Sequence, residues 1–204
     1  MIVSHSTESL SKAAQIISRG GVIAFRTDTF YGLGADPFNQ AAVRRIKQLK
    51  GREDKPILIV ISDYEHLDRF ITSMSPTFQL LAKKFWPAPL TLIGAARSEL
   101  PREITAGTKT VGVRLPNDDR VRLLVRTCGG ALTATSANPS HVAPATTARQ
   151  VHEYFAAALD LIVDDGQAQT DRPSTVVDVS QDEPRLIREG VISWNEIRAV
   201  LDID

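Results

Sequence analysis

The stretch TESLSKAAQIISRGGVIAFR, residues 7–26, decides the fold class. Apolar residues recur at helical spacing from Leu10 to Ile17, and a Gly-Gly pair, which is typical of a helix end, follows them. Residues 21–26 are then short, apolar and partly β-branched, as in a buried strand. The stretch therefore predicts a helix that leads directly into a strand, which is the repeating unit of an α/β fold.

The same alternation continues along the chain. Further strands are expected at 56–61, 90–96, 111–116, 131–135, 161–165, 174–179 and 185–190, and further helices at 39–51, 76–86, 117–127, 146–158 and 194–201. Ser62 with Glu65, and Ser193 with Glu196, have the spacing of a capping box and predict helix starts. Some later strands are joined by links too short for a helical crossover, so the sheet should be mixed. We expect a single α/β domain over residues 1–204.

The segment TDTFYGLGADP, residues 27–37, follows the first predicted strand and is expected to be an irregular polar loop. Gly32, Gly34 and Pro37 all oppose regular structure.

Composition narrows the classes of function. The 204 residues carry 24 Lys+Arg and 24 Asp+Glu, so the totals show no broad basic surface for nucleic acid. The single cysteine, Cys128, cannot form an internal disulfide, and the N-terminal residues lack a signal pattern. No apolar run approaches the ~20 residues that span a bilayer. We expect a cytoplasmic protein without a membrane segment.

Cations are concentrated in KQLKGREDKPILIV, residues 47–60. Lys50 emerges at the end of the buried helix face, and Arg52 and Lys55 lie in the turn before the next strand. These side chains could converge on a polyanion such as a triphosphate, or the acidic residues of the turn could simply neutralise them. Lys47, on another helix face, is expected to be solvated and without a role in function.

A second group of polar residues follows the buried strand in ALTATSANPS, residues 131–140. Ser136, Asn138 and Ser140 can direct hydroxyl, amide and backbone N–H groups at a ligand beyond the strand end, where ligands of open α/β sheets bind. By itself the segment is more typical of an ordinary Asn-Pro turn.

Together these segments resemble the YrdC-type threonylcarbamoyl-AMP synthase family, over nearly the whole chain. The matching segments, in the order of the family's motifs, are GGVIAFRTDTFYGLGADPF, LKGREDKPILIVI, FWPAPLTLI, TVGVRLPN, LTATSANPS, STVVDV and LIREG. The resemblance implies a twisted mixed α/β sheet around a concave cavity. There ATP, bicarbonate and L-threonine would be joined with release of pyrophosphate, and separate proteins would transfer the product to the tRNA adenosine beside the anticodon.

The resemblance also implies roles for particular residues. Lys50 and Arg52 would be catalytic, and the ATP-binding residues would be Lys50, Arg52, Lys55, Thr110, Ser136, Asn138 and Arg188. The threonine-binding residues would be Thr27, Tyr31, Arg114, Ala134 and Ser174, with Arg114 suited to the substrate carboxylate. Mg²⁺ is expected as a cofactor held mainly through the ATP phosphates. The histidines are scattered without ligand spacing, so no metal site built by the protein is expected.

The chain departs from the family pattern at three positions. Arg26 stands where proline is usual, Val60 where many members have histidine, and Ala88 where glycine is usual. Val60 would remove one contact to threonine, and Arg26 would add a charge beside the site.

Two other functions fit parts of the sequence. The basic helix face of Arg44, Arg45 and Lys47 would suit a structured-RNA-binding module without chemistry, and a weak RNA contact is compatible with the enzyme as well. A related carbamoyl-adenylating enzyme would use carbamoyl phosphate in place of threonine and bicarbonate.

Overall fold

The computed structural model describes residues 1–51 and 54–202. The strands are β1 (Ile2–Ser4), β2 (Ile23–Arg26), β3 (Tyr31–Gly34), β4 (Ile59–Ile61), β5 (Leu90–Ala95), β6 (Thr110–Arg114), β7 (Ala131–Thr133), β8 (Thr135–Ser136), β9 (Leu161–Asp164), β10 (Thr175–Asp178) and β11 (Arg185–Arg188). The α-helices are α1 (Thr7–Ser18), α2 (Gln40–Lys50), α3 (Pro76–Phe85), α4 (Arg102–Thr105), α5 (Asp119–Thr127), α6 (Ala148–Phe155) and α7 (Trp194–Leu201). Two short 3₁₀ helices, η1 (Tyr64–Arg69) and η2 (Ala156–Ala158), complete the described elements.

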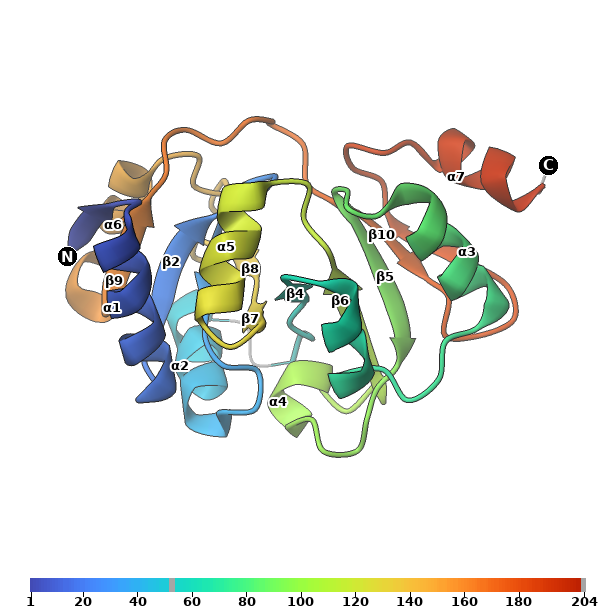
Figure 1. Ribbon diagram of the computed structural model, residues 1–204, viewed down its shortest axis with the longest axis horizontal. Coiled ribbons are helices and arrows are strands. Elements are labelled where there is room, and N and C mark those ends of the chain that lie inside the picture. The colour runs from blue at the N-terminus through green and yellow to red at the C-terminus, as the bar shows by residue number, and fades with distance from the viewer. Residues whose placement is uncertain (52–53, 203–204) are drawn as a thin grey trace.

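The strands form two mixed sheets, so the prediction of an α/β fold is confirmed, with the strands divided where one sheet had been expected. One sheet has the order β1-β9-β2-β3-β8 and the other β11-β10-β5-β6-β4-β7. In the first sheet β9 is parallel to β1 and β2, while β3 is antiparallel to β2 and β8. The two sheets lie side by side along the length of the molecule (Figure 1).

The segment predicted to be irregular contains strand β3, so that prediction was wrong. Tyr31–Gly34 pairs with β2 in the register Ile23 to Gly34 and Arg26 to Tyr31. A Cβ at Gly34 would lie only 2.7 Å from the Phe25 ring, which shows that glycine is needed there for close packing. The glycines that suggested a loop instead let a strand approach its neighbour.

The strand predicted over 131–135 is divided between the two sheets at Ala134. β7 pairs with β4 in one sheet, and β8 pairs with β3 in the other. The Ala134 amide donates to Leu58 O at 2.8 Å, and Thr133 Oγ1 donates to Leu33 O at 3.0 Å. This short segment therefore joins the two sheets.

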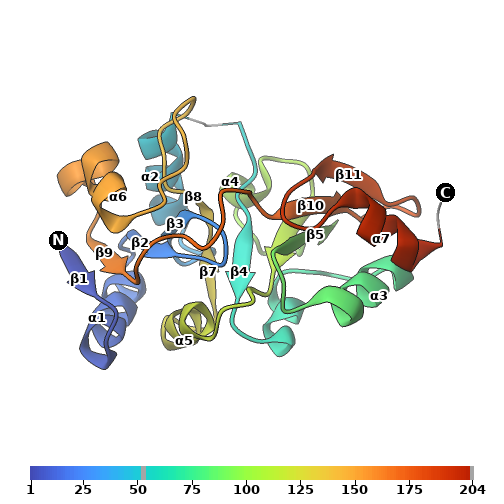
Figure 2. The same cartoon turned by 90° about the horizontal axis from the view of Figure 1, so that it is seen from above.

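The helices cover both faces of the first sheet. Figure 2 shows α1 and α5 on one side of β2 and β9, and α2 and α6 on the other. Apolar residues of α1 and α5 share a buried cluster with Phe25, and α2 contributes to the larger core. Helix α2 is capped at its start by Asn39, whose side chain accepts from the Ala42 amide. It is capped at its end by Gly51, whose φ of 61° lies in the left-handed region where glycine is favoured.

Three local features differ from the sequence-based expectations. Strand β1 and helix α4 were not predicted, because each is very short and has little periodicity of its own. The helix start predicted at Ser62 is wrong: η1 is a 3₁₀ helix that begins after Asp63, without a side-chain cap. The capping box predicted for Ser193 and Glu196 is confirmed at the start of α7.

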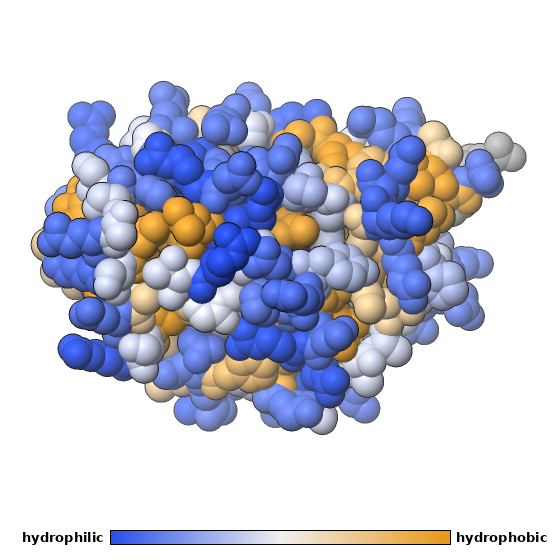
Figure 3. Space-filling view, viewed as in Figure 1, coloured by the Kyte–Doolittle hydropathy of each residue, from blue (hydrophilic) through white to orange (hydrophobic). Residues whose placement is uncertain are grey.

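The surface drawn in Figure 3 is largely hydrophilic, and hydrophobic residues appear there as separate patches. Among the residues that the structure describes, no helix is long and apolar enough to cross a membrane.

Candidate functional site

A cavity of about 530 Å³ is lined by residues of both sheets. The β2–β3 hairpin contributes Thr27 and Tyr31, and the β7–β8 junction contributes Ala134 and Ser136. The second sheet contributes Arg114 at the end of β6 and Arg188 at the end of β11. The cavity is thus formed where the two sheets meet, with polar side chains placed at strand ends.

Most of the site residues expected from the sequence line this cavity. They are Lys50, Lys55, Ser136 and Arg188 from the expected ATP side, and Thr27, Tyr31, Arg114, Ala134 and Ser174 from the expected threonine side. Two other expected residues, Thr110 and Asn138, are not among the lining residues. The Thr110 hydroxyl lies 3.0 Å from Thr108 Oγ1 instead. Arg52 lies outside the described residues.

Lys50 joins helix α2 to the loop after β8. Its side chain is 4% exposed, and Nζ donates to the carbonyl oxygens of Ser136 and Asn138, the second at 2.8 Å. The side-chain Nδ2 of Asn138 in turn donates to Val142 O at 2.6 Å. Lys50 O also accepts from Ser140 Oγ at 2.6 Å. Asn138 and Ser140 therefore shape the loop that presents Ser136, while Lys50 brings a buried cation to the cavity wall.

Lys47 is a cavity residue that the sequence analysis missed. It was expected to be solvated, but it is 5% exposed and lines the cavity together with Lys50 and Lys55. Because Lys47 precedes Lys50 by about one helical turn, the two side chains share a face of α2. That spacing was visible in the sequence and would have predicted the pair.

Arg114 is held from the opposite side by the β2–β3 loop. Its Nη2 lies 3.3 Å from Asp28 Oδ1, and Nη1 donates to Thr29 Oγ1 at 3.4 Å. Asp28 Oδ2 accepts from the Asn117 amide at 3.2 Å, so the carboxylate also fixes the turn after β6. The side chains of Arg114 and Asp28 are 6% and 4% exposed, which makes this a buried ion pair.

Arg188 and Ser174 connect the two expected subsites. Arg188 Nε and Nη2 donate to Ser174 O at 3.1 and 2.9 Å, and Nη2 donates to Ser174 Oγ at 3.1 Å. Partial withdrawal from water and repulsion from Arg114 both lower the pKa of Arg188. Two like charges that face one cavity favour an anion between them. An anionic ligand is therefore what this side of the cavity is suited to bind.

The hydroxyl groups of the threonine side already have partners. Thr27 Oγ1 donates to Phe30 O at 2.7 Å, and Ser174 Oγ lies 3.1 Å from Thr91 Oγ1. The Tyr31 hydroxyl donates to Gly166 O at 2.7 Å. Burial raises the pKa of Tyr31, which keeps this donor protonated. Tyr31 thus lines the cavity, and its hydroxyl binds the chain beyond β9.

The three residues that depart from the family pattern, Arg26, Val60 and Ala88, do not line the cavity. Arg26 is 6% exposed and forms ion pairs with Asp118 and Asp165. Val60 is 1% exposed and belongs to the buried apolar cluster that contains Ala134. The Ala88 amide donates to Leu115 O at 3.0 Å. The charge of Arg26 is therefore balanced within the protein.

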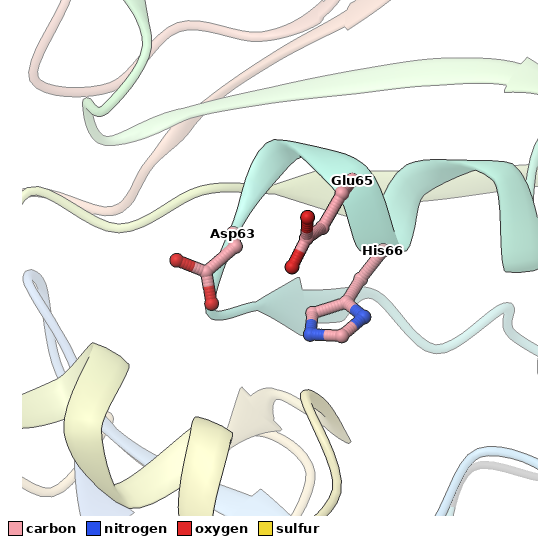
Figure 4. Close-up of side chains that lie close together, drawn as sticks. All are labelled: Asp63, Glu65 and His66. Carbon is pink, nitrogen blue, oxygen red and sulfur yellow. The ribbon is translucent and has the colours of Figure 1, made fainter.

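A group of potential metal ligands lies elsewhere, at the start of η1. Asp63, Glu65 and His66 have ligand atoms within 4.8 Å of one another, and Figure 4 shows them projecting from the same short turn. Asp63 is already paired with Arg126, whose Nε lies 3.0 Å from Asp63 Oδ2. The hydrogen bond from Arg126 lowers the pKa of Asp63. An ion pair accounts for this carboxylate without a metal.

Comparison with known proteins gives consistent matches. The Sua5/YciO/YrdC family model, described as "Telomere recombination", matches residues 15–190. The threonylcarbamoyl-AMP synthase of Pyrococcus abyssi is 37% identical over 190 residues, which are 93% of this chain and 56% of that protein. The synthase of Thiobacillus denitrificans is 41% identical over 166 residues, which are 80% of this chain and 87% of that protein.

A solved structure agrees with these sequence matches. The crystal structure of P. abyssi Sua5 complexed with L-threonine matches with a TM-score of 0.94 and 35% identity, over 98% of this chain and 61% of that one. This chain therefore spans little more than half the length of the archaeal relative.

Proposed function

Because this chain belongs to the Sua5/YciO/YrdC family, we propose that it is a threonylcarbamoyl-AMP synthase, which joins L-threonine, bicarbonate and ATP with release of pyrophosphate. The names of its relatives support this reaction, and the bound L-threonine of P. abyssi Sua5 supports the amino-acid substrate. The cytoplasmic location and the downstream tRNA-modifying proteins remain predictions from the sequence.

The observation that carries the proposal is the convergence of cations on one cavity. Lys47, Lys50 and Lys55 come from α2 and the turn after it, and Arg114 and Arg188 come from the second sheet. The lysines are suited to the phosphates of ATP, and Arg114 is suited to the carboxylate of threonine. Arg52 is proposed as a further phosphate ligand from its position in the sequence alone.

The proposed reaction brings two anions together. The amine of threonine and bicarbonate give a carbamate with loss of water. A carbamate oxygen then forms a bond to the α-phosphorus of ATP while the bond to the β-phosphate oxygen breaks, and pyrophosphate leaves. Lysine and arginine side chains withdrawn from water would screen the repulsion and stabilise the charge on the leaving group. Ser136 and the loop held by Asn138 would orient the nucleotide.

Mg²⁺ is proposed to arrive with ATP. The described cavity-lining residues include hydroxyl and carbonyl oxygens but no carboxylate, so the protein offers at most a few oxygen ligands such as Ser136. This donor set fits an ion held mainly by phosphates and water. When bound, the ion would neutralise charge on the phosphates.

The test is a chromatographic assay of the products formed from ATP with threonine and bicarbonate, supplied together or separately. The proposal expects pyrophosphate and an adenylate only when both are present. Pyrophosphate release that requires carbamoyl phosphate would favour the related carbamoyl-adenylating chemistry. Salt-sensitive RNA binding without any turnover of ATP would favour the RNA-binding module.

A further inference from the structure

A buried cluster of charged side chains connects two segments that border the cavity. Arg26, with a side chain 5% exposed, ends β2 directly before the cavity residue Thr27. Its Nη2 lies 2.9 Å from Asp118 Oδ2 and 3.0 Å from Asp165 Oδ2. Asp165 Oδ1 also lies 2.6 Å from Nη2 of the more exposed Arg120. One guanidinium group is therefore shared between two carboxylates from distant parts of the chain.

The first carboxylate belongs to the connection between β6 and α5. Asp118 follows the end of β6, where Arg114 lies, and caps α5 by accepting from the Arg120 and Val121 amides at 3.0 and 3.2 Å. The second Asp118 oxygen is the one paired with Arg26. Arg26 thus holds the chain just beyond Arg114 in a fixed place.

The second carboxylate begins the crossover segment, which we define as residues 165–174. This segment runs from β9 in the first sheet to β10 in the second, across the molecule (Figures 1 and 2). Its start is held by Arg26 and by the Tyr31 hydroxyl, which donates to Gly166 O. Its other end places Pro173 and Ser174 in the cavity wall.

We propose that Arg26 is a positioning residue for the amino-acid side of the cavity, because it sets the distance between the Arg114 turn and the crossover segment. The inference rests on the proposed function, in which Arg114 binds the threonine carboxylate and Ser174 lines the same pocket. Without Arg26, the buried carboxylates of Asp118 and Asp165 would lose the cation that they share and repel each other. Asp118 would keep no cationic partner among the described residues, while Asp165 would keep Arg120. The turn and the crossover segment would separate, and the threonine pocket would widen.

Steady-state kinetics of Arg26→Met tests this role. The KM for threonine should rise roughly tenfold to a hundredfold, as for a site displaced by a fraction of an ångström, while the KM for ATP stays within about twofold. Arg126→Met is the control, because it also removes an ion pair of α5, between Arg126 and Asp63, and neither of these residues lines the cavity. The control should leave both KM values unchanged.

A second variant separates positioning from stability. Arg26→Met combined with Asp118→Asn removes the carboxylate that has lost its cation, while Asp165 keeps its pair with Arg120 and asparagine can still cap α5. This double variant should recover the melting temperature of the wild type but not its KM for threonine. Recovery of both, or equal changes in the KM for threonine and for ATP, would overturn the proposal and leave Arg26 a purely structural residue.

Calorimetric titration with threonine measures binding without turnover, so it tests the positioning role of Arg26 separately from the proposed reaction. A wild-type protein that binds threonine but releases no pyrophosphate would reject the reaction, and weaker threonine binding by Arg26→Met than by Arg126→Met would still support the positioning role. A wild-type protein that does not bind threonine, with or without ATP, would overturn the inference.

Discussion

At the scale of single residues, the distinguishing feature is the burial of cations around the cavity. Lys47, Lys50 and Arg114 are 5%, 4% and 5% exposed. Buried charges are costly unless other groups compensate them. Lys50 is compensated by backbone carbonyls and Arg114 by Asp28. The cations are therefore oriented before a ligand arrives, which is the condition for electrostatic stabilisation of a transition state.

Replacing Lys50 by methionine should lower kcat by about 10²–10³, the usual effect of removing one well-placed electrostatic donor. Methionine keeps most of the side-chain volume, but it removes the charge and the hydrogen bonds to Ser136 and Asn138. Lys84→Met, on the exposed side of α3, is the control and should keep normal turnover. Near-normal kcat in the Lys50 variant would remove this residue from the catalytic site.

Replacing Arg114 by alanine should weaken threonine binding far more than ATP binding, because alanine cannot form the paired hydrogen bonds of a guanidinium with a carboxylate. Arg114→Lys keeps the charge but not the planar fork, so it should restore binding only in part. Titration of each ligand checks this, with Arg97→Ala as an exposed control. A loss of ATP affinity with unchanged threonine affinity would mean that the two subsites are reversed.

At the scale of elements, side chains and close contacts fix how helices and strands pack. Asp160, at the start of β9, accepts from the Val22 amide at 2.7 Å and pairs with Arg45 of α2 at 2.7 Å. Gly190, after β11, lies so close to the crossover segment that an added Cβ would be 2.1 Å from Pro173 O. Each contact predicts a measurable effect.

Asp160→Asn should lower stability near neutral pH by about 1–2 kcal/mol, because it weakens a charged hydrogen bond and a partly exposed ion pair. Partial burial alone would raise the pKa of Asp160, but the hydrogen bonds from Arg45 and the Val22 amide outweigh it and lower the pKa. A carboxyl group with a lowered folded-state pKa stabilises the protein above its ordinary pKa of ~3.9, and this contribution disappears as the pH falls through the folded value.

Melting curves from pH 7 down to pH 3 check this sign. The difference between wild type and Asp160→Asn should be largest near neutral pH and shrink in acid. Asp182→Asn, at an exposed position, should follow the wild type throughout. A difference that grows as the pH falls would contradict the assignment.

Gly190→Ala should destabilise the protein by about 3 kcal/mol, the upper end of the cost of overpacking, since backbone atoms cannot yield as a flexible side chain can. Displacement of Pro173 and Ser174 should reduce activity as well, because both line the cavity. Denaturant unfolding and the pyrophosphate assay measure the two effects. Glu189→Ala is the neighbouring exposed control, and equal behaviour of the two variants would show that the close contact is unimportant.

At the scale of the whole molecule, the cavity joins both sheets. A ligand that binds there should stabilise the described fold as one unit. At about 100 times its Kd, a ligand adds ~2.7 kcal/mol, which for a chain of this size raises the melting temperature by roughly 5–10 °C. Scanning calorimetry with ATP and threonine should show one transition that moves upward. Two transitions, of which one moves, would contradict the single domain expected over residues 1–204.

The local elements and the residue types of the site could be predicted from the amino-acid sequence. Helical spacing and a Gly-Gly stop predicted α1 and β2, and Asn39 and Gly51 marked the ends of α2. Ordered motifs indicated the family, and most of the site residues predicted from them line the cavity. Helix periodicity, caps and motifs depend on residues within a few positions of one another, so they can be recognised from residue spacing along the chain.

Which distant segments meet could not be predicted from the sequence and became visible in the folded chain. The division of 131–135 between two sheets, the pairing of β3 and the burial of Lys47 depend on partners far away in the sequence. Arg26 was expected to add a charge beside the site, but Asp118 and Asp165 balance it. Hydrogen bonds and ion pairs between distant residues form only when folding brings their atoms together. The residue periodicity of one segment predicts its own helix or strand, but it does not specify which other segment packs against it.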